Sequence, residues 1–71
     1  MTKKSAHILT REEFDAMPPN VRGYLVAMLG GDPRQPNIPA AKDYHSKPDE
    51  KIEYLGGMVE AVTEAFLRRT P

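Results

Sequence analysis

The apolar residues in the last third of the chain recur with the spacing of one face of an α-helix. Steps of three, four, three and four residues separate the members of this set, Ile52, Leu55, Val59, Val62 and Phe66. Such heptad spacing is typical of a seam along which one helix packs against another. A second set widens the apolar face and consists of Tyr54, Met58, Ala61 and Ala65. We therefore predict a long helix over residues 47–69 with more apolar surface than one short neighbouring helix can cover.

The two ends of this helix carry residues that suit helix termini, whereas its middle does not. Ser46 offers a capping hydroxyl, Pro48 fits the first turn, and Arg68-Arg69 complement the helix dipole at the end. In the middle, Gly56-Gly57 together cost about 2 kcal/mol relative to two alanines. We expect a close helix contact or a kink there, or the approach of a ligand or partner backbone.

A short helix is predicted near the start of the chain. Thr10 and Glu13 have the spacing of a capping box, in which each side chain bonds to the backbone N–H of the other residue. Leu9 and Phe14 occupy the positions of the accompanying hydrophobic staple. The helix should end near residues 15–17, because Pro18-Pro19 lack N–H donors and disfavour α geometry in the preceding residue.

A second helix is predicted after these prolines, which the first turn of a helix tolerates. One apolar stripe marks it, consisting of Val21, Tyr24, Leu25, Met28 and Leu29. Gly30-Gly31 should end it with a left-handed residue. Gly23 lies inside the helix, where it costs about 1 kcal/mol, and this predicts close backbone packing at that position.

Residues 30–46 form a proline-rich segment without a helical or strand repeat. We expect a structured loop, because its two isolated apolar residues, Ile38 and Tyr44, can pin it onto the helices. A loop of this length in a small domain is commonly functional or disordered. Its candidate partner-binding residues are Arg34, Gln35, Asn37, Tyr44 and His45. The alternative is that these residues only form solvated turns and caps. Residues 1–8 are expected to be a flexible terminus, which leaves 9–71 as a single helical domain.

Composition excludes several kinds of site and partner. The chain of 71 residues has no cysteine, two well-separated histidines, and ten basic residues matched by ten acidic ones. We therefore expect no disulfide, no metal site and no cofactor. The basic residues form no stripe, which argues against nucleic acid as a partner. The apolar runs are too short to span a membrane and no signal peptide is recognisable, so the cytoplasm is the expected location.

No catalytic set of residues can be assembled from the sequence. Residues 43–46, Asp-Tyr-His-Ser, combine an acid, a phenol, an imidazole and a hydroxyl, but neighbours in an extended loop point in different directions. Glu12 and Glu13 are adjacent on a helix and do not face one another. We predict that the chain is not an enzyme.

These patterns together predict an all-α fold with a short helix, a second helix, a structured loop and a long C-terminal helix. A chain of this size buries little core, so we expect it to assemble as a helical homo-oligomer. The predicted interface consists of Ile52, Leu55, Gly56, Val59, Val62 and Phe66. The predicted function is a small non-enzymatic protein-binding or regulatory module, for example a phage or bacterial accessory protein that inhibits a host protein.

Two alternative functions remain open at this stage. The two short helices around Pro18-Pro19 could act as a helix-turn-helix in a small DNA-binding transcriptional regulator, with Asn20 and Arg22 as base readers. An oligomer could also form a small-ligand sponge, with pockets between helix ends lined by Arg34, Tyr44, His45 or Arg69.

Overall fold

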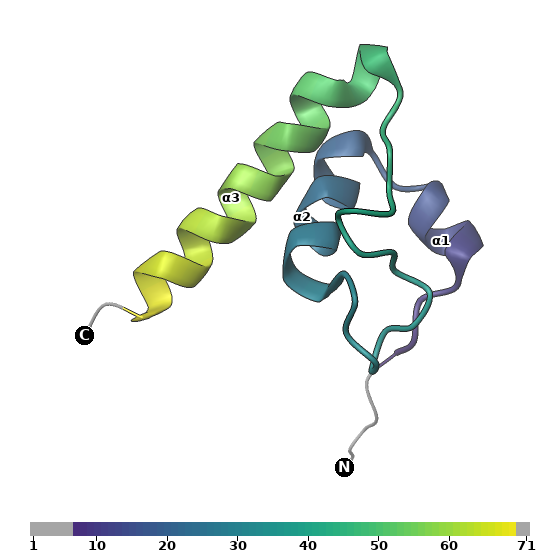
Figure 1. Cartoon of the computed structure of the whole chain (residues 1–71), viewed down its shortest axis with the longest axis horizontal. Helices are drawn as coiled ribbons and strands as arrows, with labels where there is room; N and C mark the ends of the chain where they lie inside the picture. Colours follow the sequence, from purple (N-terminus) through teal and green to yellow (C-terminus); the bar gives the residue numbers. More distant parts are fainter. Residues whose placement is uncertain (1–6, 70–71) are drawn as a thin grey trace.

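The computed structural model describes residues 7–69, and within this range its regular structure is entirely helical. Helix α1 spans Arg11–Asp15, α2 spans Pro19–Leu29, a 3₁₀ turn η1 spans Pro48–Glu50, and α3 spans Lys51–Arg69. In Figure 1, α2 lies between α1 and α3, and the C-terminal turns of α3 extend beyond α2. The predicted all-α fold is confirmed.

The local signals at α1 produce the predicted structure. The Glu13 backbone N–H donates to Thr10 Oγ1 over 3.0 Å, and the Thr10 N–H donates to Glu13 Oε1 over 2.9 Å. Both halves of the capping box are therefore present, and α1 ends at Asp15, ahead of the two prolines. Phe14 is fully buried, so this short helix contributes one aromatic side chain to the core.

Helix α2 has the predicted bounds but only part of the predicted buried face. Its only fully buried side chain is Val26, which the predicted stripe omits, while Met28 is 38% exposed. Leu25 and Leu29 of the predicted stripe do pack against the core, but the stripe missed Val26 because α2 packs on two sides, against α3 and against the loop and α1. Its C-terminal end is as expected, with Gly31 at a φ of 82° that glycine adopts without strain.

The core takes one side chain from each part of the described chain. Phe14 of α1, Val26 of α2, Ile38 of the loop and Tyr54 of α3 form its buried cluster. The Tyr44 ring lies 5.4 Å from that of Phe14 and 5.2 Å from that of Tyr54, between centroids. The prediction that Ile38 and Tyr44 pin the loop onto the helices is thus confirmed.

Helices α2 and α3 cross with a glycine from each helix against the backbone of the other. A Cβ atom on Gly23 would lie 2.0 Å from the Tyr54 carbonyl oxygen, and one on Gly57 would lie 1.8 Å from that of Asn20. Both distances are far below contact, so only glycine allows this approach. A Cβ on Gly56 would meet no atom of another part of the chain within 4 Å. Close packing within the chain therefore explains Gly57 but not Gly56.

The start of the last helix differs from the prediction. Lys47 is the N-cap, the first turn Pro48–Glu50 is 3₁₀, and no side chain caps it. Ser46 could cap the helix only if Lys47 were helical. Pro48 disfavours α geometry in the residue before it, and Lys47 is extended with a ψ of 150°. The expected Ser46 cap was therefore wrong, whereas the first-turn proline is confirmed.

We predict opposite effects of alanine at the two adjacent glycines of α3. Gly57→Ala should lower the free energy of unfolding by about 2–3 kcal/mol, because the new methyl group collides with the α2 backbone. Gly56→Ala should raise it by about 0.8–1 kcal/mol, because alanine is the better helix former and meets no neighbour. Urea unfolding followed by circular dichroism, at one low protein concentration, measures both. Similar effects at the two positions would contradict the described crossing.

Candidate functional site

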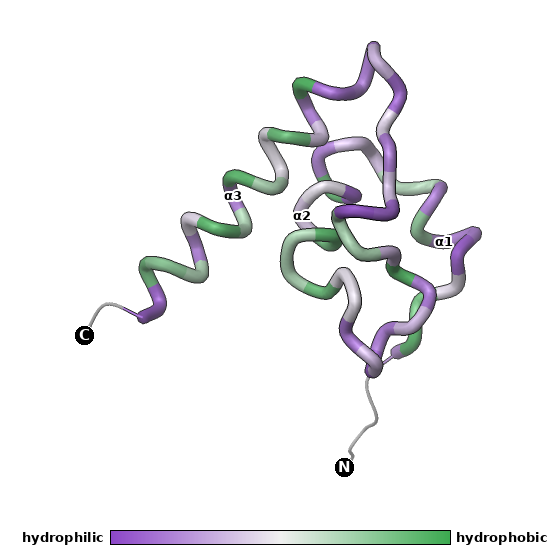
Figure 2. Tube along the Cα trace, in the orientation of Figure 1, coloured by the Kyte–Doolittle hydropathy of each residue, from purple (hydrophilic) through white to green (hydrophobic). Residues whose placement is uncertain are grey.

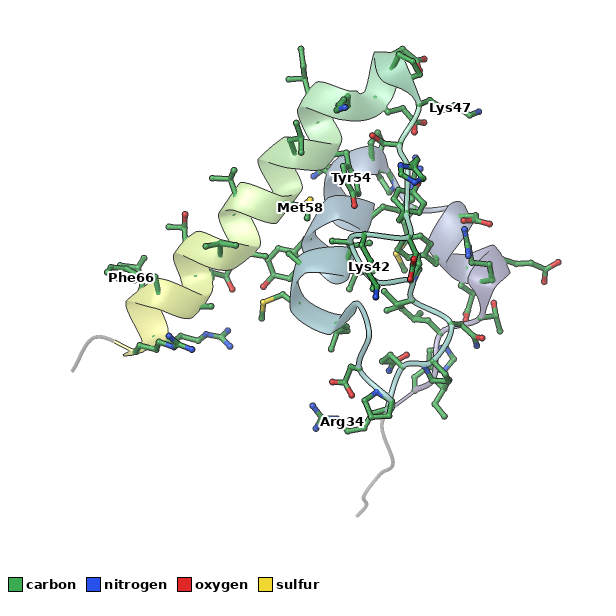
Figure 3. The ribbon with its side chains drawn as sticks, in the orientation of Figure 1. Arg34, Lys42, Lys47, Tyr54, Met58 and Phe66 are labelled. Carbon is green, nitrogen blue, oxygen red and sulfur yellow. The ribbon has the colours of Figure 1, made fainter. Side chains whose placement is uncertain are left out.

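Helix α3 has an inner apolar face and an outer one. The inner face packs toward α2 and the core through Tyr54, Gly57 and Ala61, all of which are buried. The outer face carries the predicted heptad seam, which consists of Ile52, Leu55, Val59, Val62 and Phe66. In Figure 3, Tyr54 and Met58 point toward α2, whereas Phe66 points away from it. We call these five residues the outer face of α3.

The outer face is exposed along its whole length. The exposed fractions are 87% for Ile52, 63% for Val59, 64% for Val62 and 67% for Phe66, and Leu55 is 46% exposed. Figure 2 shows hydrophobic positions in successive turns of α3, including those beyond α2. Leu55, Met58, Val59, Val62 and Thr63 line a shallow apolar hollow on this surface. The other elements of residues 7–69 leave the five side chains of the outer face about half to nine-tenths exposed, although burial of such side chains stabilises proteins.

A second hollow adjoins this face where α3 extends past the end of α2. Ala27 of α2 and Val62, Ala65, Phe66 and Arg69 of α3 line it. The sequence pattern missed Leu67, which is also 62% exposed but lies off the seam. The apolar surface of α3 is therefore broader than the predicted seam alone.

The three predicted partner-binding residues in the first half of the loop have partners within the chain. The Gln35 side chain accepts from the Leu9 N–H at 3.0 Å and donates to the His7 carbonyl at 2.8 Å. The Asn37 amide donates to the Leu9 carbonyl at 2.9 Å. Arg34 lies on the surface and pairs with Asp32 at 2.9 Å. These amides thus hold residues 7–9 against the loop; residues 1–6 of the predicted flexible terminus, and residues 70–71, lie outside the described range.

The other two predicted residues, Tyr44 and His45, lie at a polar hollow centred on Arg22. The remaining residues that line this hollow are Asp15, Lys47 and Glu50. The Arg22 guanidinium donates to both carboxylate oxygens of Glu50, at 3.2 and 3.1 Å, and its Nη1 also donates to the Tyr44 hydroxyl. Arg22 Nε donates to the Met17 carbonyl at 2.8 Å. Sequence analysis missed this network because 28 positions separate Arg22 from Glu50.

The Arg22 network is a set of paired charges rather than an open anion site. The Arg22 side chain is only 11% exposed, its guanidinium donates to groups of the chain, and the Glu50 carboxylate balances its charge. The Arg22 guanidinium in turn holds the pKa of Glu50 below the ordinary value of 4.5. Together these contacts join the segment before α2, the loop and the start of α3.

Two tyrosines have raised pKa values for different reasons. The Tyr24 hydroxyl donates to Glu64 Oε1 at 2.7 Å, and this bond raises the Tyr24 pKa above 10.0 because it would be lost on ionisation. Burial raises the pKa of Tyr54, whose hydroxyl is buried without a hydrogen-bond partner among the described residues. Neither phenol is therefore a ready proton donor near neutral pH.

The described residues show neither a metal-binding cluster nor a membrane-spanning helix. Residues 7–69 contain no group of three or more His, Asp or Glu side chains placed to hold a metal ion. None of the helices described is both long and apolar enough to cross a lipid bilayer.

We predict that Glu50→Gln flattens the acid side of the stability profile. Because the folded pKa of Glu50 is lowered, its carboxylate stabilises the fold above about pH 4.5, and this contribution is lost as pH falls through the folded pKa. The variant should be less stable than the natural chain at pH 7, and the difference should shrink toward pH 3. Urea unfolding at several pH values measures this. Glu60→Gln, an exposed change of equal charge on α3, is the control, and a gap that stays constant with pH would contradict the prediction.

Comparisons with known proteins leave the function to be argued from these side chains. No protein-family model, no curated protein and no solved structure matches the chain. The two notable side-chain arrangements of the described residues are the exposed outer face of α3 and the internally paired Arg22 network.

Proposed function

We propose that this chain is a non-enzymatic protein-binding module that docks the outer face of α3 onto an apolar surface of a protein. The observation that supports this is the exposed heptad seam along a helix of 19 residues. Taking about 100 Å² for each fully exposed apolar side chain, the five residues present on the order of 300–400 Å². Contiguous apolar patches of this size on small proteins commonly mark interaction sites.

The partners of the polar side chains favour binding over catalysis. Arg22 pairs with Glu50 and Tyr24 donates to Glu64, so the polar groups with distant partners join elements of the fold. An acid–base mechanism needs a base within reach of a nucleophile and of a bound substrate. The hollow at Arg22 contains charged groups that already neutralise each other, and the apolar hollow on α3 contains no ionisable group. A surface of that kind suits a protein partner.

A regulatory form of this function follows from the same surface. A small chain that covers an apolar surface of a larger protein can prevent that protein from binding its normal partner. We propose that the chain is a phage or bacterial accessory protein that inhibits a host protein in this way. We also propose that it acts in the cytoplasm, because it has no cysteine and so does not depend on an oxidising compartment for disulfides.

The structure gives the two alternative functions less support. A DNA-binding α2 would need free side chains to read bases, but Arg22 is almost buried and bonds to three groups of the chain. A ligand sponge would need Arg34 and Tyr44 free to bind a ligand, but Arg34 pairs with Asp32 at the surface. Tyr44 lines the polar hollow, but its hydroxyl accepts from Arg22 and its ring packs between two aromatic rings.

The proposal predicts a protein contact at Val62 in living cells. A photo-crosslinking phenylalanine analogue placed at Val62 should give a covalent protein adduct on irradiation, because the outer face would lie against another polypeptide. The same analogue at Glu12, exposed on α1, is the control. The Val62 adduct should also disappear when Val59→Glu is added, because a charge would then face an apolar surface. Equal adduct yields at Val62 and Glu12 would overturn the proposal.

A further inference from the structure

We propose that the occupant of the outer face of α3 is a second copy of this chain, packed antiparallel so that Val59 of one copy contacts Val62 of the other. This inference rests on the proposed function: the second copy covers the docking face of the free chain, and a host protein would take its place there. The area, the flanking residues and the charge distribution of α3 each bear on it.

The exposed area fits a small symmetric interface. Contact between two outer faces would remove about 600–800 Å² of apolar surface from water, and the polar side chains around them would add to the buried area. The apolar area alone is below the roughly 1,200 Å² in total at which stable specific interfaces begin, so we expect a dimer of modest affinity. A two-fold dimer is the simplest closed assembly, because one surface patch then serves both copies.

The residues beside the seam suit a close contact between identical helices. Gly56 and Thr63 flank it on one side, and Met58 and Ala65 on the other. Coiled-coil helices that choose a different partner commonly carry charges at such positions. Here the flanking side chains from residue 56 to residue 65 are uncharged and mostly small, and the charged Lys51 lies only at the first turn of the seam. Two copies can therefore approach along the middle of the seam without like-charge repulsion. A neighbouring helix would also account for Gly56, which the packing within the chain does not require.

The charges along α3 favour the antiparallel orientation. Asp49 and Glu53 lie at its start and Arg68-Arg69 at its end. Arg22 balances the charge of Glu50, and Lys47 and Lys51 balance those of Asp49 and Glu53, while Glu64 partly balances Arg68 at 3.6 Å. The start is therefore close to neutral and the end is net basic. Antiparallel helices separate the two basic ends and oppose the helix dipoles, whereas parallel helices place the basic ends side by side.

The heptad pattern then sets the register. Contact between Val59 and Val62 of the two copies also places Leu55 of each copy against Phe66 of the other. Ile52 then lies beside Arg69 of the second copy, whose aliphatic stem can cover it while the guanidinium reaches solvent. Every residue of the outer face gains an apolar neighbour in this register.

The first test is the mass of the purified full chain in solution. Sedimentation equilibrium from about 1 to 200 µM should show a reversible change from 8.0 kDa to twice that mass, as expected for an interface near the lower size limit. A chain that stays at 8.0 kDa throughout, or that assembles only into trimers or larger species, overturns the proposal.

Charge substitutions then locate the interface. Val59→Glu and Val62→Glu should each raise the dimer dissociation constant by about 100-fold, because each buries an unpaired carboxylate. Leu67→Glu is the matched control, an equally exposed apolar residue of α3 off the seam, and it should change the constant by less than about threefold. Circular dichroism verifies that each variant keeps its helices. Equal weakening by all three substitutions overturns the assignment of the interface.

Engineered cysteines test the orientation without interference, since the natural chain has none. Mixed under mild oxidation, Leu55→Cys and Phe66→Cys chains should form the mixed disulfide dimer. Leu55→Cys alone should not, because its two copies would lie about 16 Å apart along the antiparallel axis. Rapid disulfide formation by Leu55→Cys alone indicates parallel helices and overturns the antiparallel assignment.

The failure of this inference can be told apart from the failure of the proposed function. Monomeric purified protein combined with a Val62 photo-adduct to a different protein overturns the second copy and leaves the protein-binding function standing. Monomeric protein without an adduct above the Glu12 control overturns both.

Discussion

The contact on which the rest of the structure depends is the crossing of α2 and α3, where each helix places a glycine against the backbone of the other. Gly23 lies against the Tyr54 carbonyl and Gly57 against that of Asn20, so neither position accepts even a methyl group. The crossing determines how α3 is rotated about its own axis. With Gly57 facing α2, Tyr54 and Ala61 must turn inward. The heptad seam must then turn outward, because it lies on a different side of the same helix.

The polar contacts stabilise this arrangement from the other side of the molecule. Arg22 joins α2 to Tyr44 of the loop and to Glu50 at the start of α3, and Tyr44 packs between Phe14 and Tyr54. The loop is therefore a structural part of the core in addition to any role at the surface. The side chains expected to recognise a partner through this loop are largely engaged within the chain. Five of the eight large apolar side chains exposed among residues 7–69 lie on the outer face of α3, and the proposed function concerns that face.

A small chain with an exposed seam has two properties that bear on its function. Its core joins one aromatic or aliphatic side chain from each element, so its stability alone is modest. Covering the outer face would add apolar burial without any change in the internal packing. Binding and folding stability are therefore expected to be linked, because a partner that binds only the folded chain stabilises it. This linkage applies equally to a second copy and to a different protein.

The sequence by itself determined the features that depend on neighbouring residues. The capping box of Thr10 and Glu13, the break at Pro18-Pro19, and the left-handed Gly31 follow from local backbone chemistry. The helical period of α3 likewise identified a seam that remains exposed in the structure. The Ser46 cap was a local error, since the restriction that Pro48 places on Lys47 was readable from the sequence.

Only the tertiary structure decided the features that depend on residues far apart in the chain. These include the difference between Gly56 and Gly57, the burial of Val26, the pairing of Arg22 with Glu50, and the binding of residues 7–9 by Gln35 and Asn37. Helical periodicity shows which residues share a face, but it does not show which neighbour each face meets. That choice depends on the rotation of α3 against α2, which the backbone contacts at Gly23 and Gly57 determine.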